Sequence, residues 1–193
     1  MAGSALLGSR AVPVPDLFAD ESLMIEITPE NPSDAAAIET LLDQAFGPGR
    51  LEKSSYSYRK RASRLWPLCL VAREAGEIVG TIRYWPIGIG PGGAPALLLG
   101  PVAVRADHQS TGVGGLLMRA SLARATAAGH RLVVLVGDEP YYGRFGFRPA
   151  GEWGVSMERE NPARVLALPL DGTAAAIPAG VVQRWRSVRR EAA

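Results

Sequence analysis

Residues 102–115, which read VAVRADHQSTGVGG, decide the fold more than any other part of this chain. An apolar run ends at Val104, a polar segment covers residues 105–111, and a helical pattern then opens in glycines and continues to about residue 128. The first amides of a helix have no partner within it, and the helix dipole adds partial positive charge, so this end favours an anion. Glycine also lets a large anion approach the backbone closely. The stretch predicts a phosphate cradle; the alternative is that the glycines only permit close packing of the helix on a sheet.

Two common phosphate motifs fit this stretch poorly. A Walker-type loop needs Lys-Ser or Lys-Thr after its spaced glycines, whereas Gly114 and Gly115 are followed by Leu116. A dinucleotide fingerprint would need glycine in place of Leu117 and a shorter turn after the strand. Asp138 lies near where a ribose-binding acid is expected, but only 55 residues follow it. A nucleotide-binding Rossmann module therefore remains a weak alternative.

The apolar pattern predicts strands and helices in mixed order along most of the chain. Spacings of three and four residues mark the helices, and short runs bounded by turn residues mark the strands. The Pro101 ring removes an amide from the expected strand at residues 96–104, so we expect a bulge or a splayed partner there. The expected strands cover residues 23–27, 68–73, 78–85, 96–104, 132–136, a start at 147–148 and a last strand at 165–168; the expected helices cover residues 37–46, 112–128 and 139–145, with a weak pattern at 51–65.

The composition is that of one globular domain. The chain has 193 residues, 47% of them hydrophobic, and a net charge of +2, which is too small for the broad basic face of a nucleic-acid binder. Cys69 is the single cysteine and only two histidines are present, so neither a disulfide nor a Cys- or His-rich metal site is expected. No apolar run is long enough for a membrane span or a secretory signal, so we expect a cytoplasmic protein with no membrane partner.

Two motifs at a characteristic spacing give the chain a family resemblance. Residues 109–114, QSTGVG, match the pattern [Arg/Gln]-x-x-Gly-x-[Gly/Ala], and residues 141–147, YYGRFGF, match Tyr-x-x-x-Gly-Phe about 30 residues downstream. The chain therefore resembles the GNAT superfamily of acyl-CoA N-acyltransferases, well over residues 23–150 and loosely over 151–170. The resemblance implies an α/β fold, in which a central, mostly antiparallel mixed sheet is flanked by helices and splays between its fourth and fifth strands. It divides the chain into a leader (1–22), an acyltransferase domain (23–170) and an unassigned C-terminal extension (171–193).

The resemblance also implies where acetyl-CoA would bind. The pyrophosphate would lie on backbone amides of the loop, and the pantetheine arm would pair with the fourth strand at Val102 and Val104. A splay at Gly100-Pro101 would free backbone groups for that arm. No metal is implied. The loop residues assigned to the cofactor are Gln109, which shapes the turn, followed by Ser110, Thr111, Gly112, Val113, Gly114 and Gly115.

Tyr142 is the candidate general acid that reprotonates the CoA thiolate, because a phenol is protonated at pH 7 and suits a thiolate leaving group. Tyr141 is the second choice, and both rings could instead be core aromatics beside Phe145 and Phe147. The general base is open, because the strand at 97–104 lacks the acid that many family members carry there. Asp138 or a water held by strand carbonyls are weak candidates, while Asp107 and His108 are expected to be solvated and Cys69 to be a core residue.

The sequence therefore predicts an N-acetyltransferase that moves an acetyl group from acetyl-CoA directly to a primary amine of a small molecule or peptide. The alternative is a GNAT-like module that binds acyl-CoA without turnover, since the strand-four acid is missing. The acceptor cannot be predicted from the sequence; Arg83, Tyr84 and Trp85 either face its pocket or pack within a strand. A homodimer would agree with the resemblance.

Overall fold

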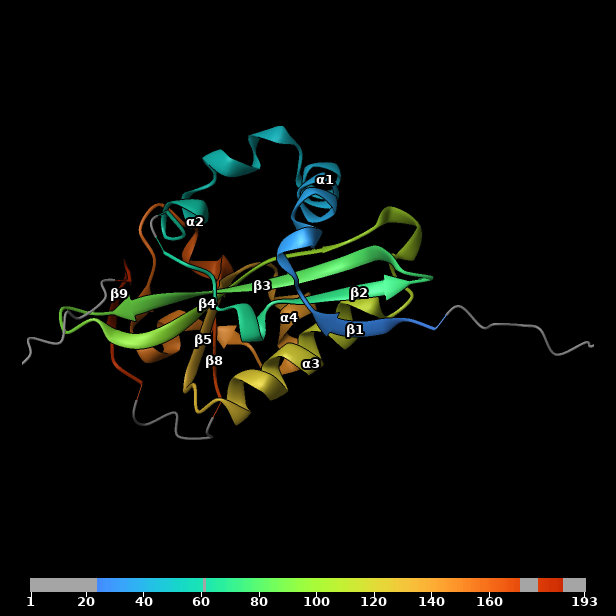
Figure 1. Ribbon diagram of the computed structural model, residues 1–193. Coiled ribbons are helices and arrows are strands. Elements are labelled where there is room, and N and C mark those ends of the chain that lie inside the picture. The colour runs from blue at the N-terminus through green and yellow to red at the C-terminus, as the bar shows by residue number, and fades with distance from the viewer. Residues whose placement is uncertain (1–23, 61, 171–176, 186–193) are drawn as a thin grey trace, which may run out of the picture.

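The computed structural model describes residues 24–60, 62–170 and 177–185. Its centre is one twisted sheet with helices on both faces (Figure 1). The main strand order is β1-β2-β3-β4-β5-β8-β6, and every pairing along it is antiparallel except β4 with β5, which is parallel. The strands are β1 (Glu26–Pro29), β2 (Leu70–Glu74), β3 (Glu77–Ile89), β4 (Ala94–Val104), β5 (Leu132–Val136), β6 (Arg148–Pro149), β7 (Val155–Ser156), β8 (Val165–Pro169) and β9 (Gly180–Arg184). The predicted mixed, mostly antiparallel sheet is confirmed.

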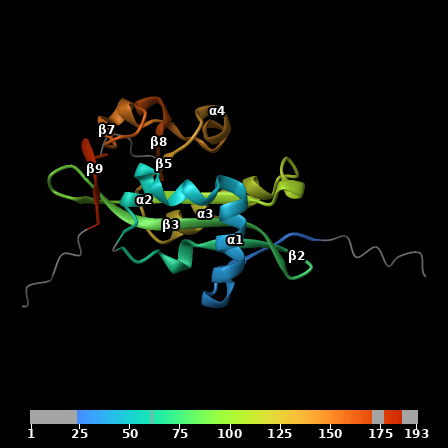
Figure 2. The ribbon, with the colours of Figure 1, turned by 90° about the horizontal axis from the view of Figure 1, so that it is seen from above.

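Two helices cover opposite faces of the sheet (Figures 1 and 2). Helix α1 (Ala35–Phe46) buries Ile38, Leu41 and Leu42 against Val71, whereas helix α3 (Val113–Ala127) packs on the side of Ala72. Successive side chains of a strand point to opposite faces, so neighbours in β2 serve different helices. Two shorter helices, α2 (Ser54–Ser57) and α4 (Glu139–Tyr142), lie beside the carboxyl-terminal half of β4 and the end of β5.

Strands β4 and β5 pair over only two positions and then separate. Their register joins Leu97 to Val133 and Leu98 to Val134, although β4 continues to Val104. The peptide between Gly100 and Pro101 is cis, Gly100 has a φ of 126°, and the pairing of β4 with β3 shifts nearby. The expected irregularity at Pro101 and the splay between these strands are both confirmed. The split leaves one edge of β4 without a strand partner beyond Leu98 among the described residues.

Three details differ from the sequence prediction. Strand β3 was expected to end at residue 85 but continues through Ile89, and main-chain pairing with β4 and β9 stabilises the extension. Residues 165–168 are not the last strand, because β9 follows and pairs with β3 and β7. In the described part of the segment 51–65, helical structure is limited to short turns before residue 61, of which α2 is α-helical. The leader 1–22 lies outside the described residues.

Candidate active site

The loop before α3 has the geometry of an anion cradle. Gly112 caps the helix with a φ of +97°, and Ser110 also has a positive φ of 65°. The first bonded turn begins where the Leu116 amide donates to the Gly112 carbonyl at 3.0 Å. The preceding amides of the helix therefore lack the partners that later residues have. A left-handed residue at this point favours glycine, which explains the glycine at position 112.

A cavity of about 620 Å³ lies over this loop. We call it the loop cavity. Of the residues that the sequence assigned to acetyl-CoA, Thr111 and Val113 do not line it: the Thr111 hydroxyl donates to the His108 carbonyl at 2.7 Å, and Val113 is buried in the core. The predicted residues that do line the loop cavity are Val102, Val104, Gln109, Ser110, Gly112, Gly114, Gly115 and Tyr142.

His108 ties the loop to the end of strand β2. Its Nδ1 atom lies 2.7 Å from Asp107 and its Nε2 atom lies 2.8 Å from Glu74. Hydrogen bonds to Asp107 and then Glu74 raise the pKa of the imidazole. Asp107 is exposed as expected, but the His108 side chain is only 12% exposed, so the prediction that it is solvated is wrong. The ring holds two carboxylates and so fixes the loop.

Tyr141 and Arg144 also line the loop cavity, where Tyr141 lies against one of the glycines. A Cβ atom on Gly114 would lie 2.7 Å from the Tyr141 hydroxyl, so the glycine permits this close approach. The guanidinium of Arg144 lies over the Tyr141 ring, 4.2 Å from its centroid. Sequence reasoning missed Arg144 as a cation beside the loop, because it treated the residue only as a variable position of a motif.

Tyr142 lies where the loop cavity meets a second cavity. Its ring packs edge-on against Tyr141 and Phe147, with centroids 4.9 and 6.1 Å away, and a Cβ atom on Gly137 would lie only 2.2 Å from its Cε2 atom. Burial, followed by the nearby Tyr141 and Asp138, raises the pKa of the phenol to about 12. The ring is thus both a core aromatic and a cavity residue, and its hydroxyl keeps its proton at neutral pH.

The second cavity, of about 440 Å³, lies at the β4–β5 split. We call it the split cavity. Its floor is the segment from Leu98 to Val102 together with residues 136–138 at the end of β5. Its other walls are polar and come from α2 and its flanks and from the segment before β8. The charged residues that line it are Arg50, Lys53, Arg59, Asp138, Glu160 and Arg164.

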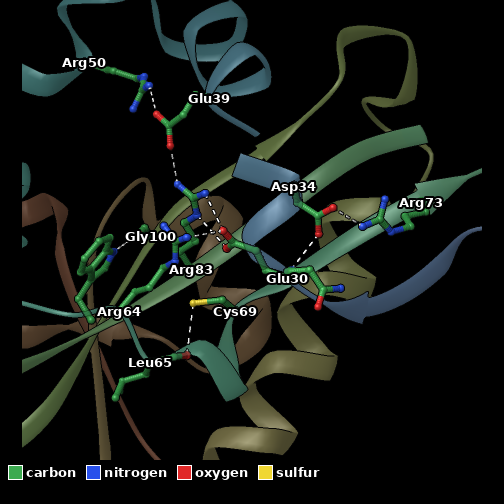
Figure 3. A network of polar contacts seen from close by, with 12 residues as sticks. Glu30, Asp34, Glu39, Arg50, Arg64, Leu65, Cys69, Arg73, Arg83 and Gly100 are labelled. Carbon is green, nitrogen blue, oxygen red and sulfur yellow. Dashed lines mark hydrogen bonds and ion pairs between the residues drawn. The ribbon is translucent and has the colours of Figure 1, made fainter. Parts of the chain in front are cut away.

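A partly buried network of arginines and acids connects β3 with α1 (Figure 3), and Arg50 of this network also lines the split cavity. Arg83 donates to both carboxylate oxygens of Glu30, at 2.9 and 2.7 Å, and to Glu39 at 2.8 Å. Arg64 pairs with Glu30 at 3.2 Å, and Arg50 pairs with Glu39. Arg83 therefore serves the network and does not line either cavity. Tyr84, which bonds Ser121, and Trp85, which donates to the Gly100 carbonyl, do not line them either.

The surroundings of Cys69 and of the cavity carboxylates show what each of these candidate residues contacts. Cys69 is fully buried, and burial raises the pKa of its thiol to about 11, as expected of a core residue. Asp138 is exposed and pairs with Arg164 at 3.1 Å. Among the described residues, Asp138 and Glu160 are the only carboxylates that line the split cavity, and Glu160 accepts a hydrogen bond from Ser54. The part of the chain that the structure describes contains no cluster of three or more His, Cys, Asp or Glu side chains arranged to hold a metal.

Comparison with known proteins identifies the family. The model of the acetyltransferase (GNAT) domain matches residues 26–150, and the chain belongs to this family. It is similar to the uncharacterized N-acetyltransferase YjhQ of Escherichia coli K12, with 34% identity over 63% of this chain and 69% of the relative.

Two solved structures are similar over most of their length. A GNAT family acetyltransferase from Brucella melitensis, in complex with acetyl-CoA, has 31% identity and a TM-score of 0.64 over 86% of this chain and 97% of that one. YhbS from Escherichia coli, in complex with CoA, has 23% identity and a TM-score of 0.74 over 92% and 94% of the two chains, which supports the fold. None of the helices within residues 24–60, 62–170 and 177–185 has the length and apolarity needed to cross a bilayer.

Proposed function

We propose that this chain is an acetyl-CoA-dependent N-acetyltransferase that transfers the acetyl group directly to a primary amine. The observation that carries the proposal is the position of Tyr142, whose ring lines both the loop cavity and the split cavity. A donor whose phosphates occupy one cavity and whose thioester reaches the junction would meet an acceptor held in the other. The Brucella relative in complex with acetyl-CoA supports the choice of donor.

The loop suits the phosphate end of this donor. The free amides at the start of α3 and the open space beside Gly112, where an added Cβ would have no neighbour within 4 Å, fit a diphosphate. Arg144 adds a cation at the same cavity. The unpaired edge of β4 beyond Leu98 fits an amide-bearing arm, which would take the place of a strand.

The chemistry needs no covalent enzyme intermediate. A neutral amine attacks the thioester carbon, the carbon–sulfur bond breaks, and the amide product retains the acetyl group. The Tyr142 hydroxyl donates its proton to the leaving thiolate. The proton that the amine loses passes to solvent, and solvent returns one to the Tyr142 phenolate, so the enzyme is restored. Holding both reactants together at one junction supplies much of the rate, since well-oriented reactants behave as if highly concentrated.

Release of free CoA thiol from acetyl-CoA in the presence of an amine panel tests this function. We expect Tyr142→Phe to lower turnover by roughly 10²–10⁴-fold with little loss of CoA affinity, because the ring remains and only the proton donor is lost. Calorimetric titration of CoA into both proteins provides the affinity control. Tight CoA binding without thiol release for any amine would instead favour the non-catalytic acyl-CoA-binding module, and unchanged turnover in the variant would remove Tyr142 from its role.

A further inference from the structure

Arg59 lines the split cavity with a guanidinium that is only partly satisfied. Its Nε and Nη1 atoms are buried and have no hydrogen-bond partner, and no described carboxylate forms an ion pair with it. Its one stabilising contact of note is with Tyr56, whose ring centroid lies 4.1 Å from the guanidinium carbon. Buried polar groups are nearly always bonded, and a buried charge without a counter-ion is costly. We therefore expect a bound ligand to supply the negatively charged hydrogen-bond acceptor that this side chain lacks.

The charges around Arg59 do not balance. Arg50 is neutralised by Glu39 and Asp43, while Arg83 and Arg64 share Glu30, and Arg83 also reaches Glu39. Burial, and then the positive charges of Arg83 and Arg50, lower the pKa of Arg59 to about 10. Four guanidinium groups thus share three carboxylates, one fewer than neutrality needs: Arg50, Arg59, Arg64 and Arg83 against Glu30, Glu39 and Asp43.

The other charges that line the split cavity do not supply the missing anion. Asp138 is already paired with Arg164. Glu160 keeps its negative charge, because its partner Ser54 is a neutral donor, but it forms no ion pair with Arg59, and the ammonium of Lys53, which lines the same cavity, offsets that charge. The excess positive charge therefore faces the same cavity that we assign to the acceptor.

The position of Arg59 also separates it from the donor. Its Nη2 atom would lie 3.2 Å from a Cβ atom on Gly100, so the guanidinium rests against β4 at the split. It does not line the loop cavity, where phosphates would bind. The pantetheine arm and the acetyl group carry no negative charge, so the anion that Arg59 lacks must come from the acceptor.

We propose that the acceptor is an amino carboxylate, whose carboxylate pairs with Arg59 in the split cavity while its amine faces the β4–β5 split. This inference rests on the proposed function for the identity of the cavity. A guanidinium matches the planar shape of a carboxylate and offers several donors to it. A free amino acid or the like therefore fits better than a neutral amine or a polyamine, which the surplus cations would repel.

Binding of reaction products tests the inference without turnover. The CoA-loaded protein is titrated calorimetrically with N-acetyl amino acids and with the matching N-acetyl amino acid amides, which differ only in the carboxylate. We expect the acids to bind roughly 10–100-fold more tightly than the amides, the range for a hydrogen bond to a charged group. Arg59→Gln should abolish that difference, Arg59→Lys should keep part of it, and Arg148→Gln should behave as wild type, since Arg148 is exposed and lines neither cavity.

Equal binding of acid and amide, no binding of either, or a preference that survives in Arg59→Gln would overturn the inference. CoA affinity and melting temperature of each variant show that it has folded. Thiol release with amino acids, their amides and their decarboxylated amines then separates the two proposals. Acid-selective binding that depends on Arg59 without any thiol release would contradict the enzyme function alone, whereas release confined to amines without a carboxylate would contradict this inference alone.

Discussion

Gly137 sets the position of Tyr142, and replacing it with alanine tests the role of that tyrosine without removing its hydroxyl. The added Cβ atom would lie 2.2 Å from Cε2 and 2.7 Å from Cδ2 of the ring, where ordinary contact begins at 3.4 Å. The ring must therefore move by about 1 Å, because Leu135 crowds the same point at 3.1 Å and the Gly137 amide is held by the Arg164 carbonyl at 2.9 Å. A displacement of that size at a reacting group costs on the order of 10²-fold in rate.

Thiol release at saturating acetyl-CoA measures this loss in Gly137→Ala, with Gly151→Ala as the matched control. Gly151 also has no positive φ, and an added Cβ there has no neighbour within 4 Å, so we expect unchanged rates. In a Tyr142→Phe background the alanine should cost little more, because the proton donor is already absent. Activity of Gly137→Ala within about threefold of wild type, or full additivity of the two changes, would refute the argument that the hydroxyl must occupy this position.

Three further predictions concern the loop and the arginine. Gly112→Pro should weaken CoA binding measured by calorimetry, because proline fixes φ near −65° whereas this residue has +97°, and it deletes an amide of the cradle. His108→Gln should reduce stability more at pH 5.5 than at pH 8.5 in thermal melts: the pKa of folded His108 is raised, so its stabilisation is present below the unfolded pKa and is lost as the pH rises through the folded one. Arg59→Met should raise the free energy of unfolding by about 1 kcal/mol in urea titrations, since it removes buried donors without partners; a clear loss would mean that stacking on Tyr56 outweighs that cost.

The sequence predicted those parts of the fold in which pattern and environment agree. Helix α1 and strands β4 and β5 have the expected apolar patterns. Pro101 predicted the split because a proline has no amide hydrogen to donate to a neighbouring strand. Strand β9 has no such signal. Only Val182 among its five residues is fully buried, and its pairing partner, the end of β3, lies more than 90 positions earlier in the chain. A short strand that is stabilised by main-chain hydrogen bonds to a distant partner needs no apolar pattern of its own, so its sequence does not predict it.

The sequence predicted the residues of the loop cavity, which we assign to the acyl donor, but not Arg59 in the split cavity, which we assign to the acceptor. Glycines and a tyrosine in short motifs identify the loop cavity, because these residues shape the cavity through the local conformation of their own segments. Arg59 lies in a polar segment without periodicity, and its importance depends on its neighbours Arg50 and Arg83 and on the carboxylates that those two arginines already occupy. A missing counter-ion is a property of the folded arrangement. No window of sequence around Arg59 can reveal it.

The β4–β5 split accounts for both kinds of unmet polar group that the folded chain leaves at this place. Within the part of the chain that the structure describes, the edge of β4 beyond Leu98 has no strand partner, and a ligand with neutral amides can satisfy those backbone groups. Against Gly100, on the same strand, the Arg59 guanidinium lacks an anion, which neutral amides cannot replace. One ligand chemistry therefore cannot satisfy both requirements. The arrangement favours two different molecules that meet at Tyr142, as a direct transfer from an acyl donor to an amino carboxylate requires.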